Sequence, residues 1–258
     1  MKKLLIAAVA SIALSSGAFA QTNAFDFGAN YGGAGEPGWT NGANAGFGFG
    51  AWAISSGAGT GGAGNFIGNP SSGGITGMST ESFGLFANPN TSGAFVNADR
   101  SLSTALQVGD TFSFQWGINF DSGSDGNKGF NLYTGGAPGV GTQIINVNNG
   151  ANANITLNGN NVNFGYGTAV MNWSFAYTDA TTLSVTANDR DGVGSFSTNI
   201  AVTGGLSSFR FYASQMQAGD SAQPYFNDLQ VVPEPSTYAL LALSAAGLGA
   251  HLIRRRRR

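Results

Sequence analysis

The strictest constraint on the fold is a ten-residue segment in which large apolar residues occupy every second position. In residues 111–120, TFSFQWGINF, the residues between them are small or polar. Successive side chains of a β-strand point to opposite faces, so the segment predicts a strand with one dry face and one solvated face. The register of such a strand is well fixed, because a shift by one residue would exchange the two faces.

The same alternation recurs through the chain. It centres on Val162–Tyr166, Trp173–Tyr177, Leu183–Val185 and Phe209–Phe211, with weaker cases at Phe47–Phe49 and Phe130–Leu132. Clusters of Gly, Asn, Asp and Ser separate these segments and are typical of turns. Asn158-Gly159 and residues 189–192 each predict a hairpin. Many short strands with frequent turns predict an all-β fold, an antiparallel β-sandwich or jelly roll, as a single domain over residues 21–232.

The N-terminal part of this domain is rich in glycine, with 18 glycines between positions 28 and 80. Its tryptophans and phenylalanines carry too much apolar surface for a disordered linker. We therefore expect a strand near Gly46–Ser55, followed by a flexible loop near Ser56–Gly64. A linker is expected only directly before Pro233.

Composition excludes several classes of function. The chain contains no cysteine, which excludes disulfides, thiol catalysis and cysteine-ligated metal centres. Its one histidine, His251, lies in the apolar segment near the C-terminus, so the body has no histidine for a Ser-His-Asp triad. Residues 21–232 contain four basic and 12 acidic residues, whereas a nucleic-acid-binding domain needs a basic surface. Nucleic acid is therefore not an expected partner.

The N-terminus has the three-part layout of a secretory signal peptide. Two lysines precede an apolar run of about 11 residues, and the segment closes with the sequence AFA. The run is too short to span about 30 Å of hydrocarbon, which disfavours the alternative of a membrane anchor. Residues 1–20 are therefore predicted to direct the chain to the general secretion machinery and to be removed by cleavage between Ala20 and Gln21.

The C-terminus carries three features in order: the tripeptide Pro233-Glu234-Pro235, an apolar segment over residues 237–253, and five consecutive arginines. Two prolines around one residue mark a boundary, because proline disrupts helix interiors and central strands. As a helix, the 17 apolar residues would rise about 25 Å, slightly less than the hydrocarbon core of a membrane. The arginines predict that this end stays in the cytoplasm while the body lies outside the inner membrane.

This ending resembles the PEP-CTERM sorting signal of bacterial, mostly Gram-negative, exported proteins. The resemblance implies recognition of Pro233, Glu234 and Pro235 by an exosortase, a membrane-bound transpeptidase-like protease that cuts near the motif. It also implies a transient hold in the inner membrane through residues 237–253, and an association with exopolysaccharide and biofilm matrix. The retention cluster would be Arg254, Arg255, Arg256, Arg257 and Arg258. The alternative is an ordinary tail anchor with a coincidental pair of prolines.

A second resemblance concerns the last expected strand. Residues 224–231, PYFNDLQV, resemble the closing strand of extracellular jelly-roll modules of the lectin and carbohydrate-binding type. In such modules the first strand commonly lies beside the last. The resemblance therefore implies that Ala24–Gly28 pairs with this strand.

Two sets of residues are candidates for ligand binding. Trp39 and Trp52 are candidate platforms for stacking on sugar rings, since indole offers a flat apolar face, and core packing is the alternative. Asp121, Asp125 and Asn127 are candidate calcium ligands in a loop rich in Gly and Ser, and a solvated turn is the alternative. No other cofactor is expected.

The sequence favours a protein without enzymatic activity. Glycoside hydrolysis needs two carboxyl groups about 5–9.5 Å apart, and the body has only two glutamates, Glu36 and Glu81, both in Gly/Ser-rich surroundings. The leading expectation is a structural or adhesive protein of the cell surface or an exopolysaccharide-rich matrix. A specific carbohydrate-binding module, assisted by calcium, is the alternative, and a glycan hydrolase is disfavoured.

Overall fold

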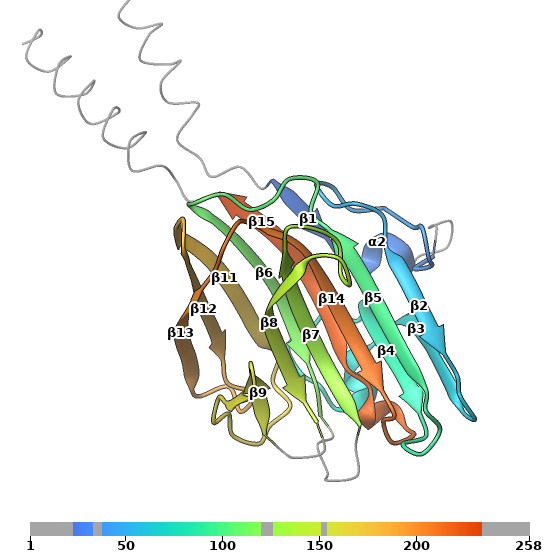
Figure 1. Cartoon of the computed structure of the whole chain (residues 1–258). Helices are drawn as coiled ribbons and strands as arrows, with labels where there is room; N and C mark the ends of the chain where they lie inside the picture. The colour runs from blue at the N-terminus through green and yellow to red at the C-terminus, as the bar shows by residue number, and fades with distance from the viewer. Residues whose placement is uncertain (1–22, 33–37, 120–125, 151–153, 234–258) are drawn as a thin grey trace, which may run out of the picture.

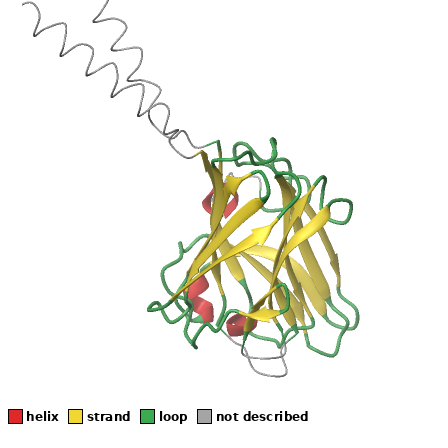
Figure 2. Cartoon of the chain, turned by 60° about the vertical axis from the view of Figure 1, so that its left-hand side comes forward, coloured by secondary structure: helices red, strands yellow, loops and turns green. Residues whose placement is uncertain are grey.

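The computed structural model describes residues 23–32, 38–119, 126–150 and 154–233 (Figure 1). The predicted signal peptide with its cleavage site, the calcium candidates Asp121 and Asp125, and the segment from Glu234 to Arg258 lie outside the described residues. Within them, strands form two antiparallel sheets that pack face to face, and loops gather at the strand ends (Figure 2). The predicted antiparallel β-sandwich is confirmed.

One sheet has eight strands in the order β13-β12-β11-β6-β15-β4-β3, with β1 paired to β15. Its strands are β1 (Ala24–Asp26), β3 (Gly62–Gly68), β4 (Ser82–Asn88), β6 (Asp110–Gly117), β11 (Met171–Asp179), β12 (Thr182–Asn188), β13 (Ser195–Ala201) and β15 (Tyr225–Pro233). The last strand of the described residues, β15, therefore lies inside the sheet, between β6 and β4. The expected pairing of the first and last strands is also present, since Ala24 lies opposite Val231.

The other sheet has seven strands in the order β10-β9-β8-β7-β14-β5-β2. They are β2 (Ala53–Gly57), β5 (Phe95–Ser101), β7 (Asn127–Thr134), β8 (Thr142–Asn149), β9 (Ile155–Leu157), β10 (Asn160–Asn161) and β14 (Leu206–Ser214). Three short helical segments complete the described residues: α2 (Ala29–Gly32), η1 (Pro70–Gly73) and η2 (Asp220–Ala222).

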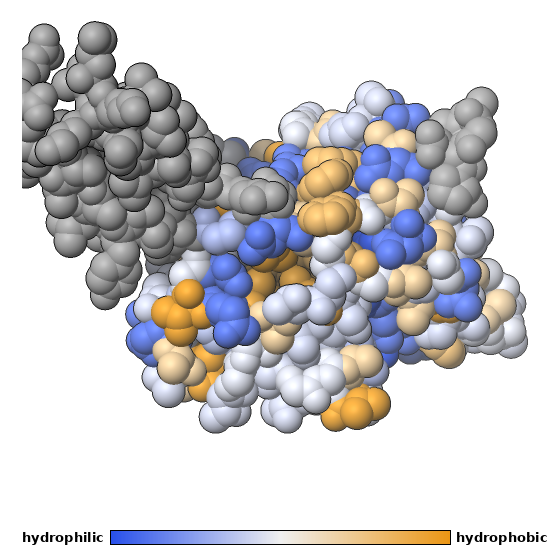
Figure 3. Space-filling view, turned by 90° about the horizontal axis from the view of Figure 1, so that it is seen from above, coloured by the Kyte–Doolittle hydropathy of each residue, from blue (hydrophilic) through white to orange (hydrophobic). Residues whose placement is uncertain are grey.

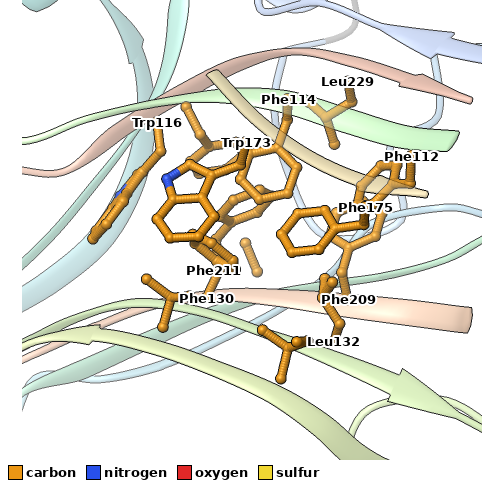
Figure 4. Packing of buried hydrophobic residues seen from close by; sticks show 14 of the residues in the cluster. Phe112, Phe114, Trp116, Phe130, Leu132, Trp173, Phe175, Phe209, Phe211 and Leu229 are labelled. Atoms are coloured by element: carbon orange, nitrogen blue, oxygen red, sulfur yellow. The ribbon is translucent and has the colours of Figure 1, made fainter. Parts of the chain in front are cut away.

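Aromatic rings from the two sheets fill the space between them (Figure 4). The ring of Phe114 on β6 lies 4.8 Å from that of Phe130 on β7 and 5.0 Å from that of Phe211 on β14, both edge to face. Phe211 in turn stacks on Phe226 of β15 at 3.7 Å. The alternating residues of β6 thus form the dry face that the sequence predicted, and buried phenylalanines hold the sheets together.

Three sequence predictions about local structure are wrong. Residues 162–166 form no strand, because Asn163 takes a positive φ of 56° and leaves Tyr166 75% exposed. The strand expected near Gly46–Ser55 begins only at Ala53, although a loop does follow it, over residues 58–61 between β2 and β3. No linker precedes Pro233, which belongs to β15 and lies opposite Asp110.

A buried ion pair between β1 and β5 joins the two sheets. Asp26 of β1 and Arg100 of β5 are 0% and 1% exposed and form a salt bridge through Oδ2 and Nη1. Tyr31 donates its hydroxyl proton to Asp26 Oδ2 at 2.8 Å. The Arg100 guanidinium donates to Gly50 O at 2.8 Å and lies over the Trp52 ring, 4.7 Å from its centroid. Asp26 Oδ1 accepts from Phe27 N at 2.9 Å and Arg100 Nη2 donates to Asn44 Oδ1 at 2.6 Å, so every charged atom has a partner, as a buried pair requires.

We predict that Arg100→Met destabilises the fold strongly, because it leaves the Asp26 carboxylate buried without its counter-ion. The free energy of unfolding should fall by about 3–5 kcal/mol. Arg210→Met is the matched control: its partner is Asp99 on a neighbouring strand, and the two side chains are 25% and 16% exposed, so the loss should be about 1 kcal/mol or less. Urea unfolding of the full chain, followed by tryptophan fluorescence, measures both. Equal losses in the two variants would contradict the prediction.

Candidate functional site

The outer face of the seven-stranded sheet carries a cross-strand row of polar side chains. Asp99, Arg210, Asn131 and Asn146 lie opposite one another on β5, β14, β7 and β8. Arg210 donates to both carboxylate oxygens of Asp99 at 2.6 and 2.7 Å, and Asn146 Nδ2 donates to Asn131 Oδ1 at 2.6 Å. The strands present these residues outward because the residues before and after them are the buried side chains of the core.

The phenol group of Tyr212 holds the side-chain amides of two asparagines in place beside this row. The Tyr212 hydroxyl on β14 accepts a hydrogen bond from Asn146 Nδ2 at 3.3 Å and lies 3.1 Å from Asn148 Oδ1. Burial raises the pKa of Tyr212 to about 12, partly offset by the hydrogen bond from Asn146. The phenol therefore stays protonated at physiological pH and holds two asparagines in place without adding charge.

Next to the row lies a hollow of 270 Å³ that we call the asparagine groove. It is lined by side chains that are polar but uncharged, together with two glycines: Asn127, Asn148, Gly150, Asn154, Thr156, Gly159 and Asn161. Each asparagine amide offers two donors and an acceptor. One pair is already engaged, since Asn148 Nδ2 donates to Asn127 Oδ1 at 3.0 Å. The groove suits a neutral ligand rich in hydroxyl groups.

The predicted Asn158-Gly159 hairpin forms one wall of the groove and is confirmed. Both residues have positive φ, 49° and 81°, which is the two-residue turn that Asn-Gly favours. The Asn158 side chain also accepts from Asn146 N at 2.7 Å and donates to Ile144 O at 3.1 Å. The side chain thus takes the place of a strand partner for β8 and holds the hairpin against it.

The asparagine groove was not predicted, although the sequence contains its signal. Nine of the 18 residues from 146 to 163 are asparagine. Composition alone does not separate a binding surface from a merely soluble exterior, since either would be rich in amides. To distinguish the two, one needs the strand register, which brings Asn127 and Asn148 together.

The predicted tryptophan platform is wrong. Trp39 and Trp52 are 4% and 1% exposed, and their rings lie 5.5 Å apart, edge to face. Trp39 packs on Phe83 of β4 at 4.9 Å, and Trp52 packs on Phe209 of β14 at 5.9 Å. Both indoles thus fill the space between the sheets and offer no face to a sugar.

The predicted calcium loop is described only at Asn127, whose Oδ1 accepts the hydrogen bond from Asn148. The described residues contain no group of three or more His, Cys, Asp or Glu side chains that could hold a metal ion. The calcium site at Asp121, Asp125 and Asn127 therefore stays a prediction.

The second notable region is the end of the sandwich at which β15 finishes. We call it the exit end and define it by Ala24, Phe25, Phe47, residues 102–110 and Pro233. Here Pro233 lies opposite Asp110, and Asn23 N donates to Val231 O at 2.8 Å. The chain thus leaves the sheet directly into the tripeptide Pro233-Glu234-Pro235.

Residues 231–258 match the PEP-CTERM protein-sorting motif. This PEP-CTERM motif implies recognition by an exosortase and export of the chain to the cell surface. It overlaps β15 over residues 231–233, so the motif begins inside the sheet. No helix among the described residues is long and apolar enough to cross a membrane.

Comparison with solved structures finds general likenesses in fold. Arcelin-5, a lectin-like defense protein from Phaseolus vulgaris, is 12% identical over 71% of this chain and 98% of its own, with a TM-score of 0.40.

 A carbohydrate esterase from Shiga toxin-encoding bacteriophage phi24B is 10% identical over 71% of this chain and 90% of its own, with a TM-score of 0.43. The cellulose induced protein Cip1 is 12% identical over 70% of this chain and 90% of its own, with a TM-score of 0.41. These likenesses concern the general fold alone. No curated protein matches the chain in sequence.

We predict that Tyr212 makes the fold less stable at high pH. Between pH 10 and 12 the unfolded chain loses the Tyr212 proton while the folded chain keeps it, because the pKa in the fold is about 12. The folded state then binds more protons, so the free energy of unfolding falls as pH rises, by about 2–3 kcal/mol at pH 12. Below pH 10 this group has no effect.

Urea unfolding of the full chain at pH 9 and pH 11, compared with Tyr212→Phe, tests this prediction. The variant should lose less stability over that interval than the wild-type chain. Burial also raises the pKa of Tyr31, Tyr177 and Tyr225, so a part of the pH dependence should persist. Equal losses in the two chains would contradict the assignment.

Proposed function

We propose that the chain is an exported, non-enzymatic protein of the bacterial cell surface or extracellular matrix, sorted by an exosortase and associated with exopolysaccharide. The observation that carries the proposal is the PEP-CTERM motif at residues 231–258, which continues directly from the last strand. Residues 1–20 serve as the signal peptide for the general secretion machinery. Residues 237–253 hold the chain in the inner membrane until it is processed, with the five arginines on the cytoplasmic side.

Structural roles of five described carboxylates support a non-enzymatic body. Asp26 and Asp99 are neutralised by arginines. Asp110 accepts from Gln107 N at 2.8 Å, Asp179 from Thr181 N at 2.8 Å and Asp191 from Val193 N at 2.8 Å. These hydrogen bonds fix turns, and those to Asp179 lower the pKa of its carboxyl group. A general acid needs the opposite shift, toward neutral pH.

We predict that the variant with both Glu234→Ala and Pro235→Ala is not sorted. In a host with an exosortase, the unprocessed chain should accumulate in the inner-membrane fraction, because the protease no longer recognises the motif. Glu81→Ala, which removes a glutamate far from the motif, is the control and should be sorted like the wild type. Cell fractionation and immunoblotting measure location and size. Unchanged location and size of the double variant would count against the proposal.

The asparagine groove favours a second candidate function, the specific binding of a neutral polysaccharide. Its amides lie on β7, on β8 and on or directly before the β9–β10 hairpin, which side-chain hydrogen bonds of Asn158 hold against β8, so few of them have to be ordered when a ligand binds. Neutral donors and acceptors match sugar hydroxyls, which present both. Asn127 lines the groove and follows Asp125 by two residues. Calcium held by Asp121, Asp125 and Asn127 would therefore act at the rim of the groove.

We predict that Asn148→Ala combined with Asn154→Ala weakens binding of the full chain to a bacterial exopolysaccharide. Each lost hydrogen bond is worth about 0.5–1.5 kcal/mol, so the dissociation constant should rise roughly tenfold. Asn172→Ala is the matched control, since Asn172 is an exposed asparagine on β11 of the other sheet. Retention on a panel of immobilised exopolysaccharides, first with calcium and then with chelator, measures binding.

Saturable binding that the groove variant weakens and the control does not would support this second function. Loss of binding in chelator would identify Asp121, Asp125 and Asn127 as calcium ligands. Absence of binding across the panel, or equal binding by both variants, would reject the groove as a polysaccharide site. The sorting proposal would be unaffected.

A further inference from the structure

The exit end carries large apolar side chains that the fold leaves in solvent. Phe25 is 39% exposed, Phe47 is 59% exposed and Val108 is 58% exposed. Their positions near the chain exit follow from strand register. Phe25 lies opposite Gln230 of β15, and Val108 belongs to the turn that leads into β6 at Asp110.

Backbone hydrogen bonds hold these side chains at the surface. Phe25 and Phe47 exchange two backbone hydrogen bonds of 2.9 Å, and their rings lie 5.9 Å apart. The turn with Val108 is closed by Gln107 N donating to Asp110 Oδ2 at 2.8 Å, and Gly109 N donates to Tyr177 O at 2.8 Å. A hollow of 470 Å³, lined by both Phe47 and Gln107, lies between the two sites. These contacts hold the side chains in place at the surface, and Figure 3 shows hydrophobic residues at the surface on this side of the molecule.

The length of the chain beyond β15 limits how far the exit end can lie from a membrane. Only residues 234–236 separate Pro233 from the apolar segment 237–253. Four Cα–Cα steps span at most about 14 Å, and the headgroup layer on each side of a bilayer is about 5–8 Å thick. A chain held by residues 237–253 therefore has its exit end within several ångströms of the headgroups.

We propose that the exit end is a membrane-contact surface, with Phe25, Phe47 and Val108 entering the headgroup region while the chain is still unprocessed. The proposal rests on the proposed function, because it takes residues 237–253 as the membrane segment. Partial burial of apolar side chains in the interface is favourable.

Charge indicates which lipids this surface fits. Asp110 lies in the exit end, and Asp179 is the last residue of β11, two positions beyond Tyr177, which contacts the same turn. Of the basic side chains among the described residues, Arg100, Lys128 and Arg190 are buried, and Arg210 pairs with Asp99 in the middle of β14. The described exit end therefore has no exposed cation to attract anionic lipid. The surface fits zwitterionic lipid and binds by apolar contact.

Single-cysteine labelling tests the proposal directly, since the chain has no cysteine of its own. Val108→Cys carries an environment-sensitive fluorophore at the exit end. Val193→Cys is the matched control: it is a valine, 89% exposed, in the β12–β13 turn at the opposite end of the strands. Each labelled full chain is reconstituted into phosphatidylethanolamine and phosphatidylcholine vesicles, and vesicle flotation reports whether it is anchored. We expect blue-shifted emission and quenching by headgroup spin-labelled lipid at position 108 and neither effect at position 193.

The outcomes separate this proposal from the proposed function. If the chains float with the vesicles but the labels at positions 108 and 193 both emit as in water, the membrane-contact surface is overturned and the anchor stays in place. Equal shifts at both positions would indicate adsorption without orientation and would also overturn it. Failure to float would reject residues 237–253 as the anchor, and with it the contact surface. Adding Phe25→Ser and Phe47→Ser to the Val108→Cys chain should reduce the shift, and an unchanged shift would contradict a role for the two rings.

Discussion

The fold depends on the buried salt bridge between Asp26 and Arg100, because it is a fully buried charged contact that crosses from one sheet to the other. Arg100 also binds Gly50 O and covers the faces of Phe49 and Trp52. The glycine-rich segment around residues 44–52 has little regular structure of its own, and the guanidinium fixes its path between the sheets. Residues 21–232 contain only four basic residues, and one of them, Arg100, lies against this segment. Hydrophobic packing alone would leave the segment without a defined position.

Sequence reasoning succeeded where side-chain periodicity carries the information. The strands at residues 111–117, 171–177 and 209–213 have strict alternation, and both predicted hairpins form. It failed where tertiary contacts override the local pattern. Residues 162–166 alternate, but the positive φ of Asn163 breaks the strand. Trp39 lies in a glycine-rich segment that suggests exposure, yet the partners that bury it, Phe83 and Phe226, come from distant strands.

The two candidate sites also differ in how much of each the sequence reveals. The PEP-CTERM motif is a linear signal, so the sequence alone reveals it. The asparagine groove joins residues on β7, β8 and the β9–β10 hairpin, and its shape depends on register and on the phenol of Tyr212 beneath. The two sites also lie at opposite ends of the strands, since β7 begins at Asn127 in the groove and ends at Thr134, next to Leu206. A chain held at the exit end would present the groove away from the lipid.

The position of β15 has a mechanical consequence. The strand lies between β6 and β4 and ends at Pro233, so a load between Pro233 and the opposite end of the strands runs along its axis. Tension applied through the C-terminal segment therefore acts parallel to β15 and perpendicular to its hydrogen bonds. Under such shear the bonds to β6 carry the load together, whereas a hairpin pulled from its open end would release its bonds one at a time. A protein tethered by this end would resist unfolding under flow or when its matrix is stretched.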